Sequence, residues 1–186
     1  RQRELRDVPP LASGTFELLA NEVDWWAKLR MNCILLNVAY AGDPVTWAQW
    51  KRVVIPEITR RGLLLGLGEH GSYGLFLPPG RYGADHPDWY CEIDGQRIPS
   101  FQHPQHGGLL QFCTSNVAAV DTYIENFVAF AQANPEITVY SPTPSDGGAW
   151  CQCDRCRLVP VADCYLALDN RLAAALRDIS PEIRVV

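Results

Sequence analysis

The hydrophobic pattern of the chain switches repeatedly between two periods. Four stretches place apolar residues three or four positions apart, as on one face of a helix, at residues 16–30, 45–61, 117–133 and 163–179. Four shorter stretches are apolar nearly throughout and are bounded by Gly, Pro, Asn or Asp, which is typical of strands buried on both faces; they are residues 32–40, 63–68, 137–140 and 183–186. The sequence therefore predicts helices and strands in alternation.

Single residues mark the ends and irregularities of these elements. Gly62 ends the second predicted helix, and Asn134-Pro135 ends the third, because the residue before proline disfavours helical backbone. Pro56 lies inside the second helix, where its missing N–H predicts a kink. Tryptophans at helical spacing are expected in the core rather than around a cofactor, and they occupy positions 25, 26, 47 and 50.

Alternating helices and strands predict an α/β fold with parallel strands joined by right-handed crossovers. An open doubly wound sheet would suit the length, but no Gly-rich phosphate turn follows the first strand. The other architecture is a (β/α) barrel of TIM type, which has eight units in about 250 residues. We predict that this chain covers about the first half of such a barrel, with the doubly wound sheet as the alternative.

Residues 1–186 are expected to form one partial barrel domain with two long connections. An irregular loop insertion at about 72–115 is longer than compact domains spend without a functional reason, so it is expected to border an active site. A cysteine-rich loop covers residues 141–160. Because half a barrel leaves strand edges open, the remainder of a longer chain or self-association is expected to cover them.

The charge of the chain excludes some partners. A formal net charge of -5 supplies no basic stripe for phosphates, so nucleic acid and anionic membrane surfaces are not expected partners. No apolar run reaches the roughly 18 residues of a membrane-spanning helix, and the N-terminus lacks the layout of a signal peptide. Both ends of the chain look cut from something longer. A neutral or mildly polar substrate is expected.

Polar and aromatic residues follow the first three predicted strands. Because the carboxyl ends of parallel strands meet at one edge, these residues are expected in one cleft. Glu69 and Asp146 are the carboxylates at these ends and form the candidate pair for acid and base catalysis. The candidates for binding a substrate or stacking on a sugar ring are Asn37, Tyr40, His70, Tyr73 and Trp150.

The polar candidates also have purely structural interpretations. His70 would equally suit a bond to loop backbone, and Glu69 would suit an exposed or ion-paired loop carboxylate. Asp146 precedes two glycines, as in an ordinary turn. The residues alone leave these alternatives open.

The seven cysteines are an odd number and cannot all pair within one chain. Cys151, Cys153 and Cys156 are close enough in sequence to bind one tetrahedral metal ion if a fourth ligand joins them. Cys113 is the first candidate for that ligand, and Cys164 is the second. We predict a structural zinc ion and no organic cofactor. A disulfide plus a free thiol is the alternative, and a redox-active thiol is a weaker one.

Five motifs stand in order along the chain: Asp24-Trp-Trp-Ala-Lys-Leu-Arg-Met-Asn32, Gly68-Glu-His70, His86-Pro-Asp-Trp-Tyr90 with Asp94-Gly95, Gln111-Phe-Cys-Thr-Ser-Asn116, and Ser145-Asp-Gly-Gly-Ala-Trp-Cys-Gln-Cys-Asp-Arg-Cys156. This ordered set resembles a bacterial domain-of-unknown-function family of glycoside-hydrolase-like TIM barrels, related to hexosaminidases and α-glucuronidases. The resemblance runs from about residue 22 to residue 156. It implies a carbohydrate-active domain, and a secreted or periplasmic location, because many members are exported.

The resemblance also implies a position for the catalytic acid. Hexosaminidases carry an Asp-Glu pair at the end of the fourth barrel strand, where the Glu is the general acid. This chain has Ser145-Asp146 there and no Glu. Asp146 therefore either takes the acid role or only binds sugar hydroxyls. The leading hypothesis is hydrolysis of glycosidic bonds by carboxylate acid/base chemistry. The alternative is a non-catalytic carbohydrate-binding or structural module with a zinc- or disulfide-stabilised cysteine loop.

Overall fold

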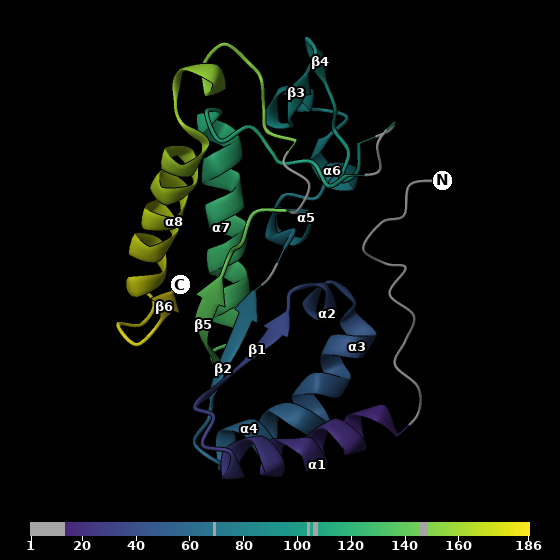
Figure 1. Cartoon of the computed structure of the whole chain (residues 1–186), viewed down its shortest axis with the longest axis vertical. Coiled ribbons are helices and arrows are strands. Elements are labelled where there is room, and N and C mark those ends of the chain that lie inside the picture. Colours follow the sequence, from purple (N-terminus) through teal and green to yellow (C-terminus); the bar gives the residue numbers. More distant parts are fainter. Residues whose placement is uncertain (1–13, 69, 104, 106–107, 146–148) are drawn as a thin grey trace.

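A parallel sheet forms the centre of the computed structural model, which describes residues 14–68, 70–103, 105, 108–145 and 149–186. Its four strands are β1 (Cys33–Asn37), β2 (Leu64–Gly68), β5 (Ile137–Ser141) and β6 (Arg184–Val185). They lie in chain order, and the described part of the chain lacks the reversal of order that a doubly wound sheet contains (Figure 1). The predicted α/β fold with parallel strands is confirmed.

Helices cover one face of this sheet. Three predicted helices are confirmed as α1 (Thr15–Lys28), α7 (Val117–Ala133) and α8 (Val161–Arg177). Phe127 of α7 packs edge-on against Tyr140 of β5, with ring centres 5.1 Å apart. The same core contains strand residues Ile34, Leu36, Leu65, Leu67 and Ile137 and helix residues Val23, Ile58 and Leu172. None of the described helices is long and apolar enough to cross a membrane.

The opposite face of the sheet is also apolar but lies outside this core. Leu35 and Val139 flank Gly66 from the two neighbouring strands, so all three residues share that face. Val139 is buried, whereas Leu35 is 42% exposed and Leu64 is 37% exposed. In the described part of the chain, one face of the sheet is therefore packed against helices and the other is partly open.

The second predicted helix forms as three consecutive segments. These are α3 (Pro44–Gln49), the π-helical turn η2 (Trp50–Val54) and α4 (Ile55–Arg60). Pro56 has no N–H to donate to the carbonyl of Arg52, four residues earlier, so the regular helical ladder cannot continue through this point. A wider π turn next to the proline accommodates the break. The predicted irregularity at Pro56 is thus present, as a π turn.

The first strand is shorter than the predicted stretch 32–40. It ends at Asn37, whose Oδ1 accepts a hydrogen bond of 2.8 Å from the N–H of Ala39. That bond starts a short helix, α2 (Ala39–Gly42), which contains Tyr40. The strand prediction was wrong in these last residues, because apolar content does not distinguish a buried strand from a buried helical turn.

The prediction that all four tryptophans lie in the core was wrong for one of them. Trp47 and Trp50 are buried and Trp26 packs against the core, but Trp25 is 59% exposed. Helix α1 packs through residues such as Val23. Two positions further on, a side chain points to the opposite side of the helix, at about 200°. Trp25 therefore faces away from the core.

The stretch predicted as an irregular insertion at 72–115 contains short regular elements. They are α5 (Ser72–Phe76), α6 (Pro79–Tyr82), the 3-10 turn η3 (Pro87–Trp89) and a hairpin of β3 (Glu92–Ile93) and β4 (Gln96–Arg97). Phe76 anchors them by packing on Phe127 of α7, with ring centres 4.0 Å apart. Figure 1 shows these elements beyond the carboxyl ends of the strands, where a barrel-type fold places its site.

Strands β2 and β5 approach each other closely at that edge of the sheet. A Cβ at Gly68 would lie 2.5 Å from the carbonyl oxygen of Ser141 and 2.6 Å from its Cβ. Only glycine fits here, because the clash would involve backbone that cannot move aside. Gly68 therefore brings together the two segments that follow these strands.

We predict that Gly68→Ala destabilises the fold by about 1–3 kcal/mol, because the added methyl group forces β2 and β5 apart. Urea denaturation measures the change. Gly108→Ala is the matched control, since a Cβ at Gly108 would meet no atom within 4 Å. It should alter the free energy of unfolding by no more than about 0.5 kcal/mol. Equal effects of the two substitutions would contradict the close approach.

Candidate functional site

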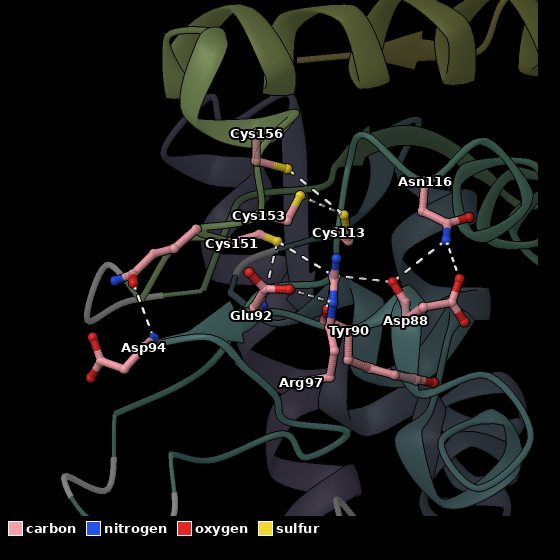
Figure 2. Close-up of polar contacts among 11 residues, drawn as sticks. Asp88, Tyr90, Glu92, Asp94, Arg97, Cys113, Asn116, Cys151, Cys153 and Cys156 are labelled. Carbon is pink, nitrogen blue, oxygen red and sulfur yellow. Dashed lines mark hydrogen bonds and ion pairs between the residues drawn. The ribbon is translucent and has the colours of Figure 1, made fainter.

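Four cysteine sulfurs converge beyond the carboxyl ends of the strands. The Sγ atoms of Cys113, Cys151, Cys153 and Cys156 all lie within 4.8 Å of one another (Figure 2). The Sγ of Cys113 is 3.7 Å from those of Cys153 and Cys156. A disulfide requires about 2.05 Å. Sulfurs bound to one tetrahedral zinc at about 2.3 Å are about 3.8 Å apart. The group could therefore hold a metal ion.

All seven cysteines lie in the described part of the chain, and none forms a disulfide. The predicted meeting of Cys113 with the three loop cysteines is confirmed, whereas Cys164, the second choice, lies outside the group. Cys153 and Cys156 share one tight turn, in which the N–H of Arg157 donates to the carbonyl of Cys153 at 3.0 Å. A local backbone hydrogen bond thus helps to bring these two sulfurs to the same group.

The cysteine group shares its protons unequally. Hydrogen bonds from the Cys113 and Cys151 thiols lower the pKa of Cys156, and Ser115, whose Oγ is 3.1 Å from that sulfur, adds to the effect. Hydrogen bonds to the other sulfurs and burial raise the pKa of Cys113. Cys156 is therefore the member of the group that is favoured to lose its proton, and the thiolate is the form of cysteine that binds metal.

Three of the five sequence motifs meet around these sulfurs. The N–H of Cys113 donates to the carbonyl of Trp89 at 2.8 Å. The Nδ2 of Asn116 donates to the carboxylate of Asp88 at 2.7 Å, while its Oδ1 caps α7 by accepting from Ala119. The motifs at 86–90, 111–116 and 145–156 are thus neighbours in space as well as ordered in sequence.

The residues predicted to bind substrate lie around the strand ends in different surroundings. Asn37 starts α2, and Tyr40 packs on Trp50 with ring centres 5.4 Å apart. His70 is exposed, and its Nδ1 lies 2.8 Å from the carbonyl oxygen of Pro144, as the structural interpretation expected. Trp150 is half-buried edge-on against Tyr165. Their roles toward a substrate stay predictions.

Of the remaining predicted site residues, Tyr73 is buried and the two candidate carboxylates lie outside the described part of the chain. Tyr73 is 3% exposed, is stacked on Phe101, and has a pKa well above its usual value because of burial. A stacking role for Tyr73 stays a prediction that its burial does not favour. Glu69 and Asp146 lie outside the described residues, so their roles stay predictions too.

A buried glutamine that sequence reasoning missed joins the segments at the strand ends. Gln111 is 2% exposed. Its Nε2 donates to the carbonyl of Ser145 at 2.8 Å, and its Oε1 accepts from the hydroxyl of Tyr165 at 2.6 Å and from the N–H of Ser145 at 3.3 Å. One polar residue between Leu110 and Phe112 was the available signal, because buried amides are found where they can be hydrogen-bonded.

A small hollow lies beside this glutamine, lined by residues of α5, α7, α8 and the segment after β5. Its polar lining includes a bonded pair, with Ser72 Oγ and Tyr123 OH 2.9 Å apart. Asp169, one helical turn from Tyr165 on α8, has a buried Oδ1 without a partner among the described residues, and burial raises the pKa of its carboxyl to about 6. The hollow is therefore lined by hydroxyls and an amide, and a carboxyl of altered acidity lies one helical turn along α8 from its Tyr165.

Comparison with known proteins gives this architecture a family. The model of a domain of unknown function, DUF4838, matches residues 12–185. The chain belongs to the DUF4838 family. A search of the curated proteins finds no match for this DUF4838 domain.

A solved structure shares the fold of the DUF4838 domain. It is a debranching enzyme from Nostoc punctiforme in an acarbose-soaked crystal, with a TM-score of 0.57 at 13% identity. The likeness covers 90% of this chain but 38% of that enzyme. At this identity, the comparison supports a shared fold and leaves the activity of the DUF4838 domain to be proposed.

We predict that Gln111→Ala lowers the free energy of unfolding of the DUF4838 domain by about 2–4 kcal/mol, because it leaves buried partners on Ser145 and Tyr165 unsatisfied. Tyr165→Phe removes one of these bonds and should cost about 1 kcal/mol. Urea denaturation measures both. Gln111→Ala behaving like Tyr165→Phe would show that the bonds to Ser145 add nothing.

Proposed function

We propose that this DUF4838 domain is part of a TIM-type barrel that binds carbohydrate at the carboxyl ends of its strands and hydrolyses glycosidic bonds there. The observation that carries the proposal is the gathering of polar groups at that edge, on a sheet whose fold resembles a debranching enzyme. In barrels of this type, active sites form at the carboxyl ends of the strands. This location also agrees with the family resemblance of the five motifs.

The open face of the sheet supports the barrel. Strands in chain order with helices on one face are the arrangement of consecutive barrel units, whose other face points inward. Leu35 and Leu64 are the partly exposed apolar residues of that inward face. Further strands would cover them, from the rest of a longer chain. The chain spans 38% of the debranching enzyme that it matches, which agrees with a partial barrel.

The catalytic roles fall to the two strand-end carboxylates. Asp146 follows Ser145, which Gln111 fixes, and is the candidate general acid. Glu69 follows Gly68 on the neighbouring strand and is the candidate second carboxylate. Two carboxyl groups flanking one glycosidic bond can divide the acid and base roles. His70 and Trp150 would bind the sugar, by hydrogen bonding and stacking respectively.

A carbohydrate-binding module without catalysis is the second candidate function. The sequence favours it at one position, because Gly147 follows Asp146 where the related hexosaminidases carry the Glu that acts as general acid. In that case Trp150 and His70 would still bind sugar, and Asp146 would bind hydroxyl groups only.

We further infer that the four cysteines bind a structural zinc ion. Four thiolates at these separations fit a closed tetrahedral site, which leaves no position for a substrate. Zinc bound there would cross-link residue 113 to the loop at 151–156. This cross-link would stabilise the loop, which follows Asp146 closely in the sequence.

Asp146→Asn should lower kcat on glycosides by about 10²- to 10⁴-fold, as loss of a general acid does. The assay uses the full-length protein that carries this domain, a panel of nitrophenyl glycosides and oligosaccharides, and circular dichroism to verify folding. Asp178→Asn, at an exposed position where α8 ends, is the control and should leave kcat unchanged. Binding without turnover in the unmodified protein would replace hydrolysis by the binding function.

The purified protein should contain about one zinc ion per chain by elemental analysis. Cys153→Ser should remove most of this zinc, because three thiolates and a hydroxyl bind it less tightly. Cys164→Ser is the matched control, since this cysteine lies outside the group, and it should retain the ion. Equal zinc content in the two variants would contradict the site.

A further inference from the structure

Arg97 of β4 lies directly beneath the cysteine group (Figure 2). Its Nη1 is 3.6 Å from the Sγ of Cys151 and donates to the carbonyl of Tyr90 at 2.8 Å. Its Nε pairs with the carboxylate of Glu92 at 3.1 Å. The guanidinium is therefore held on several sides while one N–H contacts a sulfur.

Glu92 contacts the sulfur of Cys151 directly and also binds Arg97. Its backbone N–H donates to the Sγ of Cys151 at 3.4 Å, and its carboxylate orients the guanidinium of Arg97. The hairpin thus offers two donors to Cys151, one from the backbone and one from a charged side chain. Hydrogen bonds to a metal-bound sulfur fix its orientation and withdraw charge from it.

The contact between Arg97 and Cys151 places a positive charge beside the cysteine group. A divalent ion with four thiolates carries a net charge of -2, and two of the four cysteines are buried while Cys151 and Cys156 are half-buried. Arg97 and Glu92 have side chains 25% and 24% exposed, so solvent screens them only in part.

We propose that Arg97 is a positioning residue of the metal centre, which holds Cys151 in its metal-binding orientation and offsets the thiolate charge, with Glu92 fixing the guanidinium. This proposal rests on the zinc site proposed above. It extends the centre from four ligands to the β3–β4 hairpin. The simple structural alternative is that Arg97 only fastens the hairpin to the carbonyls of Tyr90 and Asp88.

Zinc affinity, measured by chelator competition on the full chain, tests the proposal. Arg97→Gln should weaken zinc binding by about 10- to 100-fold, as loss of an outer-shell partner does. Arg97→Lys keeps the charge and should recover part of the loss. Arg157→Gln is the control: it removes the same charge from an exposed position next to Cys156 and should leave the affinity unchanged.

Replacing zinc by cobalt distinguishes the two roles of Arg97, which are to orient Cys151 or only to hold the β3–β4 hairpin in place. The thiolate-to-cobalt charge-transfer band should move to longer wavelength in Arg97→Gln, because loss of an N–H donor raises the energy of the sulfur electrons. Glu92→Gln should shift it the same way by less, so it provides a test if Arg97→Gln fails to fold. The d–d bands, which report tetrahedral geometry, should stay in place.

Two outcomes overturn different claims. If the unmodified protein binds neither zinc nor cobalt, the metal centre itself is refuted, and the role of Arg97 with it. If the unmodified protein binds zinc while the Arg97 and Glu92 variants keep its affinity and band position, only the role of Arg97 is refuted, and the hairpin-fastening alternative holds.

Discussion

The segment that follows β5 is held at two points by one short stretch of chain, and the site depends on this constraint. Gln111 bonds both backbone groups of Ser145, and two residues later Cys113 meets the sulfurs of the cysteine loop. Leu110, the residue before Gln111, also forms a β-bridge with Ala149, which lies between Ser145 and Cys151. Ser145 and the residues from Ala149 to Cys153 are therefore held by contacts with residues 110–113 rather than by their own turn chemistry.

The rest of the fold brings these two points to the edge of the sheet. Gly68 lets β2 and β5 approach closely, so the segments that follow them share an edge. Phe127 of α7 packs on β5 and on Phe76, which ties the short elements of the insertion to the core. The hairpin carrying Arg97 then closes on the cysteine group from the other side. Core packing, hydrogen bonding and sulfur chemistry thus support one location.

Local patterns predicted much of this structure. Periodicity alone predicted the alternating elements, and cysteine spacing predicted three members of the cysteine group, because both signals lie within a few residues. The contacts of Gln111 with Ser145 and of Arg97 with Cys151 join residues 34 and 54 positions apart, and no local pattern encodes them. Trp25 shows the same limit, since spacing defines a helical face without saying what covers it.

Hydrogen–deuterium exchange on the metal-loaded and chelator-treated protein tests most directly whether the cysteine centre holds the strand-end segment. We predict that chelation speeds exchange in residues 110–113 and 142–158, while the core of α7 keeps its protection, because its packing does not involve the sulfurs. Unchanged exchange in residues 142–158 after the metal has left would contradict a centre that holds this segment.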